Sequence, residues 1–340
     1  MAGDAARARL LAERARAAGD RGASARALAL FDDALAELDE RGCDPLVADV
    51  LRWKGTLLRE SGDTAGANRL DLRSRAVAER AALSEAKAHA LNCLAIVAQR
   101  RGDLREAERH YKNAAELALV IGDHRLLGMI EQNLGVLANM RGDFDSARTR
   151  YAKSLGAFER AEDTQAVSWV LNNIGMLHTK RKEYDDARTA LERGLEIAVL
   201  RGDAVVESIV TLNLAELWIG TGEFDRAAGA CARSLENAQH RGDHLTAAEA
   251  LTCRAKIERE RGAFDDGIAT LRIARYEADG SEDPLLQAEI LREWGDISRA
   301  AGDGSGARSA WSKAAESYHL AGAIRDAAEV EARLSALEMH

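Results

Sequence analysis

Residues 133–151 read NLGVLANMRGDFDSARTRY, and variants of this segment recur along the chain at intervals of 40 residues. Its central glycine belongs to a series in which only Lys182 departs from glycine: Gly22, Gly62, Gly102, Gly142, Gly222, Gly262 and Gly302. A second series, offset by 20 residues and interrupted by Ala82, Glu162 and Glu282, contains Gly42, Gly122, Gly202, Gly242 and Gly322. Glycine adopts the left-handed backbone that ends a helix, and the aspartate that often follows it caps the next helix. The two series therefore predict sixteen segments, each long enough for one helix and a short turn.

Small residues recur at a fixed place on either side of each turn of the first series. Before the turn they are Gly55, Ala95, Gly135, Gly175, Ala215, Ala255 and Gly295. After it they are Ala27, Ala67, Ala107, Ala147, Ala187, Ala227, Gly267 and Ala307. Small residues on both helices allow the two backbones to approach closely, while large neighbours fill the remaining holes. No single hairpin of helices can bury both of its faces, so the repeats are expected to stack into one continuous core.

The pattern N-L-G followed by G-[DE]-[FY]-x-x-A, with Tyr151 four residues further on, resembles a tetratricopeptide repeat. The 40-residue length is similar to the longer repeats of kinesin light chain, LGN-type scaffolds, Rap-type bacterial peptide receptors and MalT-like bacterial regulators. The resemblance implies an all-α fold, a right-handed α-solenoid of eight helix-turn-helix repeats in a single domain over residues 1–340. The repeats are expected at residues 8–47, 48–87, 88–127, 128–167, 168–207, 208–247, 248–287 and 288–327, with a capping helix at 328–340.

Three repeats depart from this pattern. Repeat 2 has Thr64 and Asp71 where aromatic residues belong, repeat 8 has Gly304 with Trp311 further on, and repeat 5 has Lys182 at its turn. We expect the helices to form at all three places, with repeat 2 packing less well than the others.

Composition agrees with an all-helical chain and excludes several classes of function. Of 340 residues, 46% are hydrophobic, 4% are aromatic and two are proline, and proline is the residue that interrupts helices. A net charge of −9 argues against a general nucleic-acid binder, because phosphate contacts need a positive surface. No run approaches the ~18 apolar residues of a membrane span and no apolar leader begins the chain, so we expect a cytoplasmic protein without a membrane partner. The scattered Cys43, Cys93, Cys231 and Cys253 form no C-x-x-C pair and are expected to be reduced thiols.

No motif for catalysis, metal binding or cofactor binding is present in the sequence. The eight histidines form no H-E-x-x-H and no pair four residues apart on one helix, because His240 and His244 lie on either side of the Gly242 turn. The chain has no G-x-S-x-G nucleophile motif, and no pair of carboxylates is distinguished as acid and base. The sequence therefore predicts no catalytic residues, no metal site and no cofactor.

The resemblance implies that the first helix of each repeat lines a concave groove. One column of this surface reads Trp53, Cys93, Asn133, Asn173, Asn213, Cys253 and Glu293. Three consecutive asparagines would form a ladder, and an asparagine amide can both donate to and accept from a peptide backbone. One residue earlier, a second polar row contains Asn92, Gln132 and Asn172, and the apolar candidates nearby are Met129, Trp169, Ile209 and Met176. The outer repeats place charges here instead: Asp49, Arg52, Glu249, Lys256, Glu289, Arg292 and Asp296.

A purely structural interpretation of the same residues stays open. Trp169 and Met129 could pack between adjacent repeats, and an inward-facing asparagine could bond a neighbouring carbonyl oxygen. The sequence alone does not decide between a ligand groove and a structural ladder.

Three hypotheses of function follow. The first is a non-catalytic scaffold that binds a protein or peptide segment in the concave groove of repeats 3 to 6. The second is a ligand- or peptide-sensing regulatory module, similar to MalT-like or Rap-type bacterial regulators, that works with a separate output domain. The third is a self-assembling scaffold, in which a second copy of the chain is the partner.

Overall fold

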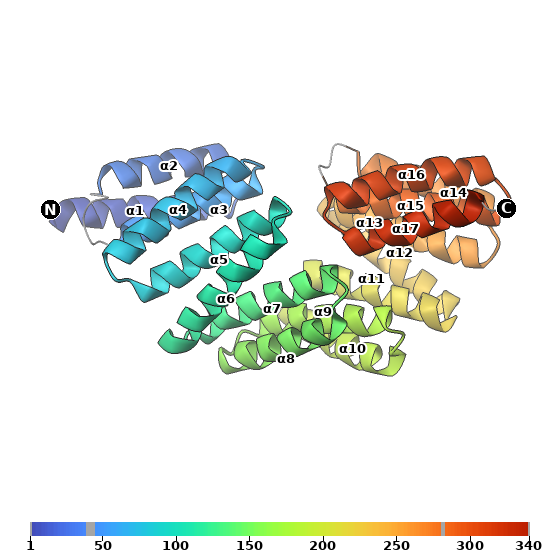
Figure 1. Cartoon of the computed structure of the whole chain (residues 1–340), viewed down its shortest axis with the longest axis horizontal. Coiled ribbons are helices and arrows are strands. Elements are labelled where there is room, and N and C mark those ends of the chain that lie inside the picture. The colour runs from blue at the N-terminus through green and yellow to red at the C-terminus, as the bar shows by residue number, and fades with distance from the viewer. Residues whose placement is uncertain (1, 39–44, 280–282, 339–340) are drawn as a thin grey trace. The chain divides into compact units, whose positions relative to one another are not determined.

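The computed structural model describes residues 2–38, 45–279 and 283–338, so Gly42, Cys43 and Glu282 lie outside the described residues. The described residues form seventeen α-helices and no strand (Figure 1). The helices are α1 Ala2–Gly19, α2 Ser24–Ala36, α3 Pro45–Glu60, α4 Thr64–Arg80, α5 Ser84–Arg100, α6 Leu104–Ile121, α7 His124–Met140, α8 Phe144–Arg160, α9 Thr164–Lys180, α10 Tyr184–Arg201, α11 Ala204–Thr221, α12 Phe224–Arg241, α13 His244–Glu260, α14 Phe264–Glu277, α15 Pro284–Ala300, α16 Gly304–Leu320 and α17 Ile324–Glu338. We call α1, α3 and the further odd-numbered helices up to α15 first helices, and α2 to α16 second helices.

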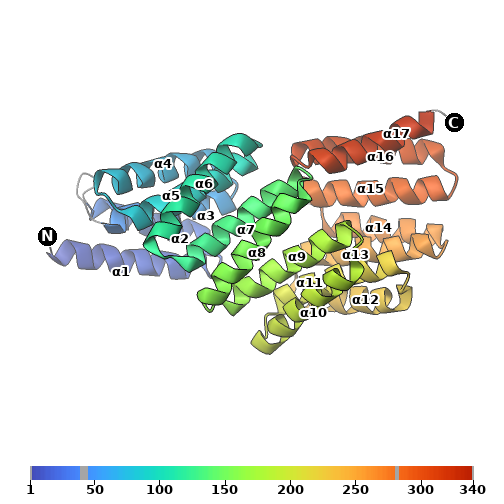
Figure 2. The same cartoon turned by 60° about the horizontal axis from the view of Figure 1, so that its bottom comes forward.

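The helices confirm the expected all-α repeat architecture, with each first helix packed against the second helix that follows it (Figure 2). The boundaries differ slightly from those expected. The capping helix α17 begins at Ile324, four residues earlier than expected, and α7 begins at His124 rather than at residue 128. The reason is local, since Asp123 caps α7 by accepting a hydrogen bond from the backbone N–H of Leu126 at 2.9 Å.

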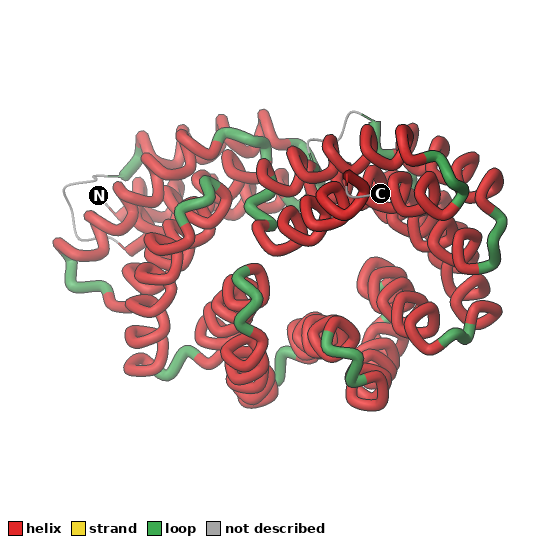
Figure 3. Tube along the Cα trace, turned by 45° about the vertical axis from the view of Figure 1, so that its right-hand side comes forward, coloured by secondary structure: helices red, strands yellow, loops and turns green. Residues whose placement is uncertain are grey.

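The turns between the helices are drawn in green in Figure 3. Most of them have the left-handed backbone that the glycine series predicted. Eleven glycines of the two series have positive φ, among them Gly142 at 76° and Gly202 at 66°. The same conformation is kept where glycine is missing, at Ala82, Glu162 and Lys182, with φ of 53°, 53° and 61°. These three turns therefore form despite the steric cost of a Cβ atom in the left-handed region.

The glycines among the small residues of the first helices each face a side chain of the following second helix. A methyl group on Gly135 would lie 2.5 Å from Cε1 of Tyr151, and one on Gly175 would lie 2.4 Å from Cγ of Leu191. In repeat 2 the inserted residue is Asp71, which is 0% exposed and whose two carboxylate oxygens have no hydrogen-bond partner. Burial raises the pKa of this carboxyl to about 7, against the opposing effect of Arg59 and Arg52. The poorer packing expected for repeat 2 stays a prediction, but its buried carboxyl lacks the hydrogen-bond partners that a buried polar group normally has.

The chain divides into two compact units, residues 1–134 and 135–340, which we call unit 1 and unit 2. The boundary falls within α7, and each unit has core clusters of its own. The single domain expected over residues 1–340 stays a prediction.

Unit 2 is curved, with its first helices on the inner side. Neighbouring first helices pack against one another, α9 with α11, α11 with α13, and α13 with α15. Among the described residues, no two neighbouring second helices of unit 2 are packed as closely. In a curved stack of helices, those on the concave side lie closer together than those on the convex side. The exposed side of α9, α11, α13 and α15 is therefore the inner, concave face of unit 2.

Helix α11 has the length and the apolar composition of a membrane-crossing helix, a feature that the sequence prediction missed. Its apolar residues are accounted for by packing. Leu214, Ala215 and Leu217 are at most 2% exposed and belong to a core cluster shared with α10, α12 and α13.

Candidate binding site on the inner face of unit 2

The predicted residues of α9 lie on the inner face on successive turns. Trp169, Asn173 and Met176 are spaced four and three residues apart, which places them on one side of the helix. Met176 is 37% exposed, while Trp169 and Asn173 are half-buried. The neighbouring helix α11 adds Ile209 and Asn213, also half-buried. These five residues of two packed helices form what we call the α9–α11 patch.

Asn213 is part of a structural ladder. Its side-chain Nδ2 donates a hydrogen bond to Oδ1 of Asn172 at 2.7 Å, which joins α11 to α9. Asn172 is 3% exposed, and its own Nδ2 lies 3.7 Å from Sδ of Met176. For this pair the structural interpretation left open by the sequence is confirmed, with a side-chain amide rather than a backbone carbonyl as the acceptor.

Asn173 differs from Asn213 although both occupy the same column of the repeat. No hydrogen bond joins its side chain to any other residue that the structure describes, and the side chain is half-buried rather than fully exposed. A half-buried amide retains one acceptor and two donor hydrogens that a ligand can use. Trp169 beside it also packs against the core of the following repeats, so its ring serves as a rigid wall of the patch.

Beyond α11 the inner face changes from amides to ion pairs. Glu216 of α11 pairs with Lys256 of α13. Arg259 of α13 donates from Nε to Oε1 of Glu293 on α15 at 2.7 Å. Asp296 of α15 in turn pairs with Arg333 of α17. We call these three contacts the ion-pair ladder, because each joins one odd-numbered helix to the next.

The ladder controls the protonation of the buried groups that it contains. Burial alone would lower the pKa of Lys256, but Glu216 and Glu289 outweigh it and the pKa lies above its ordinary value. Burial raises the pKa of Glu293, and Arg259 opposes that effect. Glu249 stands outside the ladder. Desolvation by the surrounding inner face, helped by Glu289, raises the pKa of Glu249 to about 7 although the side chain reaches solvent.

The remaining predicted site residues belong to unit 1. Met129 is 38% exposed, and Gln132 and Asn133 are half-buried on α7. Asn92 of α5 is 3% exposed, and its Oδ1 has no hydrogen-bond partner. The predicted row from Asn133 to Asn173 joins residues of both units and stays a prediction.

The sequence did not foresee two groups of potential metal ligands. One group is His178, Glu183 and Asp186, and within it Nδ1 of His178 lies 2.6 Å from Oε2 of Glu183, whose other oxygen accepts from Arg181 at 2.7 Å. The carboxylate thus already contacts two side chains of the chain itself. The other group is Glu85, His89 and Asp123, in which burial and Arg52 lower the pKa of His89.

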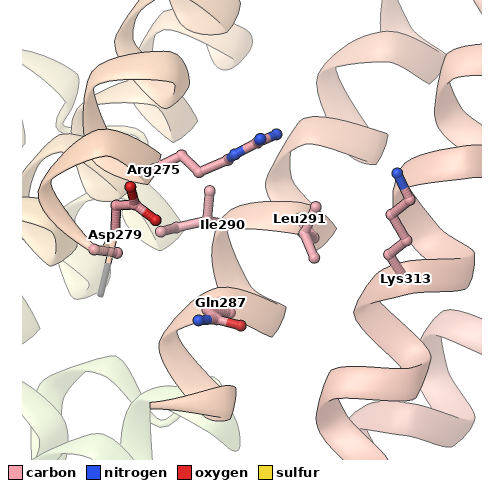
Figure 4. A pocket seen from close by; sticks show the side chains of 7 residues that line it. Arg275, Asp279, Gln287, Ile290, Leu291 and Lys313 are labelled. Carbon is pink, nitrogen blue, oxygen red and sulfur yellow. The ribbon is translucent and has the colours of Figure 1, made fainter. Parts of the chain in front are cut away.

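A cavity of about 300 Å³ lies away from the patch, between α14, α15 and α16 (Figure 4). Arg275 and Lys313 flank it and Ile290 and Leu291 line it, together with Ala278, Asp279 and Gln287. Helix α14 has 14 residues, whereas α12 has 18 and α16 has 17, so the space opens where α14 ends early. None of the residues predicted for the site lies in this cavity.

A family model described as a tetratricopeptide repeat matches residues 86–160 and 132–199. This match agrees with the helical hairpins, with the left-handed turns, and with the contacts between glycines of the first helices and side chains of the second helices. Together these observations identify the fold. The described residues have the tetratricopeptide-repeat fold.

Solved structures support this assignment for the fold alone, since all are distant in sequence. Aspartyl phosphate phosphatase F from Bacillus subtilis has a TM-score of 0.65 and 14% identity over 79% of this chain and 69% of its own. The tetratricopeptide-repeat sensor protein of the STAND ATPase class from Pyrococcus horikoshii has a TM-score of 0.64 and 16% identity, over 96% of this chain and 47% of its own. The Rap conjugation gene regulator of plasmid pLS20, in complex with the Phr* peptide, has a TM-score of 0.60 and 13% identity, over 84% of this chain and 74% of its own. No curated protein sequence is significantly similar to this chain.

Proposed function

We propose that unit 2 is a non-catalytic module that binds an extended or helical segment of another protein on the α9–α11 patch. The observation that carries the proposal is Asn173, a half-buried amide without a partner among the described residues, beside the exposed side chain of Met176. Methionine adapts its shape to different apolar surfaces, and a rigid tryptophan ring next to it gives a typical anchor for a partner side chain. A backbone amide of the partner would pair with Asn173 while an apolar side chain contacts Met176 and Ile209.

The ion-pair ladder supports this placement by contrast. Its charges are already paired with one another, so a ligand there would have to displace a partner before it gained a contact. On the α9–α11 patch, a ligand can bind Asn173 without breaking a hydrogen bond or an ion pair of that side chain. The Rap regulator that resembles this chain in fold is itself described in complex with a peptide, which agrees with a peptide as the ligand class.

A phage-displayed library of random peptides tests the proposal with a pool of ligands that favours no particular partner. Unit 2 within the full chain is expected to select peptides, and Asn173→Ala is expected to weaken their binding at least tenfold, about 1.4 kcal/mol, by calorimetry. Arg272→Ala is the matched control, because Arg272 is exposed on the second helix α14. Peptides that bind Asn173→Ala as tightly as the wild type, with an unchanged melting curve, would refute the proposed site.

The alternative function is that of a sensing module with a separate output domain. Likeness over 96% of this chain to a protein described as carrying a tetratricopeptide-repeat sensor favours it. The two functions differ in what binding does, since a sensor must change shape when its ligand binds. Small-angle scattering with and without a selected peptide separates them, because a scaffold keeps its radius of gyration and a sensor does not.

A further inference from the structure

The two ends of unit 2 touch each other. The turn between α7 and α8 lies against the turn between α16 and α17, and Figures 1 and 2 both show these helix ends together. The guanidinium Cζ of Arg325 lies 4.6 Å from the centre of the Phe144 ring. A methyl group on Gly142 would lie 3.5 Å from Cδ of Arg325, and one on Gly322 would lie 4.0 Å from Cε of Met140.

The contact is built by the capping helix. Ala327 and Val330 of α17 are 0% exposed in the core with α16. Its first turn instead projects Arg325 towards Phe144, and Glu329 holds the guanidinium with Oε1 at 3.2 Å from Nε. The capping helix therefore covers the last repeat with one face and reaches the first repeat of unit 2 with its tip.

We propose that Arg325 and Phe144 form a clasp that closes unit 2 into a ring around its inner face and so controls access to the α9–α11 patch. This rests on the proposed function for the identity of the site, but the clasp itself is independent of it. A closed ring admits a chain with a free end, which can thread along the axis. A loop inside a folded partner enters only after Arg325 has left Phe144. The partner class that fits the closed state is therefore a short peptide or a chain terminus.

The contact between Arg325 and Phe144 is weak enough to open and close while the rest of unit 2 stays folded. An arginine over an aromatic ring at a partly exposed site is a weak interaction, and van der Waals contacts at Gly142 and Gly322 accompany it. The ion-pair ladder, by contrast, joins each odd-numbered helix to the next odd-numbered helix from α11 to α17. Opening therefore separates the two ends while each repeat stays attached to its neighbours.

Distance measurement by pulsed electron paramagnetic resonance tests the clasp without any ligand. Spin labels are placed at Ser146→Cys and Ala328→Cys, both exposed, after replacement of Cys43, Cys93, Cys231 and Cys253 by alanine. We expect one short, narrow distance distribution in the parent protein. In Arg325→Glu, more than half of the label pairs should move to longer distances. In Arg325→Lys, the distance between the labels should stay short.

Two controls make the result specific. Arg272→Glu makes the same change of charge on an exposed residue of α14 and should leave the distribution unchanged. Labels at Ser146→Cys and Asp186→Cys, on the neighbouring helices α8 and α10, should report the same distance in Arg325→Glu as in the parent. A parent distribution that is already broad, or one that Arg325→Glu leaves short, would overturn the clasp.

Chemical access tests the gating. Asn173→Cys places a thiol on the inner face in a column where the chain already has Cys93 and Cys253, and Asn173 makes no hydrogen bond to another described residue, so the fold should accept it. We expect Arg325→Glu to speed its reaction with a polymer-bearing maleimide several-fold, with little effect on N-ethylmaleimide. Equal acceleration of both reagents, or of neither, contradicts gating. Failure of the peptide selection, by contrast, leaves both of these results intact and refutes only the proposed function.

Discussion

The inner face of unit 2 has two halves that share a backbone and differ in chemistry. In the column of Asn173 and Asn213, the following repeats have Cys253 and Glu293. The α9–α11 half is joined by one amide–amide hydrogen bond, and the half from α11 to α17 is joined by three ion pairs. Equivalent positions of a repeat can therefore hold the repeats together with neutral or with charged pairs.

The difference indicates a division of roles. The ion-pair ladder is self-neutralised and fixes how α13, α15 and α17 stack. The α9–α11 patch uses Asn213 for stacking and leaves Asn173 and Met176 for a ligand. The two halves should respond differently to substitution, and four sets of substitutions test this from the largest expected effect to the smallest.

Breaking the ion-pair ladder should cost the most stability. Arg259→Met leaves the carboxylate of Glu293, which is 2% exposed, without its partner. A buried charge left unpaired costs about 3 kcal/mol, which chemical denaturation would measure. Arg193→Met is the control, because the side chains of Arg193 and its partner Glu159 are 51% and 47% exposed, and an exposed ion pair contributes little. Equal losses in the two variants would mean that the ladder is not structural.

Removing the hydrogen bond between Asn213 and Asn172 should cost less stability than breaking the ion-pair ladder. Replacing Asn173 should cost almost no stability. Asn213→Ala removes one hydrogen bond and leaves Oδ1 of the buried Asn172 unsatisfied, a loss of about 1–2 kcal/mol. Asn173→Ala removes no hydrogen bond and should keep the melting temperature while weakening peptide binding. Thermal unfolding of the two variants side by side checks this, and a reversal of their order would contradict the assigned roles.

Only the charged half should make stability depend on pH near neutrality. The pKa of Glu249 rises from its ordinary value of 4.5 to about 7 in the folded chain, so folding favours the protonated carboxyl. This group therefore destabilises the fold progressively as the pH rises from about 4.5 to about 7, with no further change above that. Glu249→Gln should reduce the fall in melting temperature between about pH 5 and about pH 8. An identical fall in the variant would show that Glu249 does not titrate in this range; Asp71 accounts for a separate contribution from unit 1.

The smallest effect is expected at the turn that ends α9. Lys182 has a φ of 61°, a conformation that costs a residue with a Cβ atom about 1 kcal/mol. Lys182→Gly should raise the stability of unit 2 by roughly that amount, less the extra entropy of glycine in the unfolded chain. Glu162→Gly, with a φ of 53° in the preceding repeat, should act in the same direction. A loss of stability in both variants would contradict strain at these turns.

The features predicted correctly from the sequence are those set within one repeat. The left-handed turn at Gly142 and the close approach of two helices at Gly135 depend on neighbouring residues, and they recur every 40 residues. The bond from Asn213 to Asn172 rather than to Asn173 depends on the rotation of one helix against the next. Adjacent residues point about 100° apart on a helix, so a repeat pattern does not fix which of the two meets Asn213.

Side-chain contacts between different repeats could not be predicted from the sequence for a related reason. Arg259 and Glu293 are 34 positions apart rather than 40, because a long side chain reaches along the neighbouring helix. The contact of Arg325 with Phe144 depends on curvature summed over the repeats between them. Both become visible only when the stacking geometry is known.

Photo-crosslinking from Met176 tests the central claim most directly. A benzoyl-phenylalanine placed at residue 176, where the side chain is 37% exposed on the inner face, is irradiated with a peptide selected from the displayed library. The same probe at Glu236, exposed on the second helix α12, is the control. We expect a crosslinked peptide from residue 176 that excess unlabelled peptide removes, and none from residue 236. Crosslinking from residue 236 alone, or equally from both positions, would contradict binding on the α9–α11 patch.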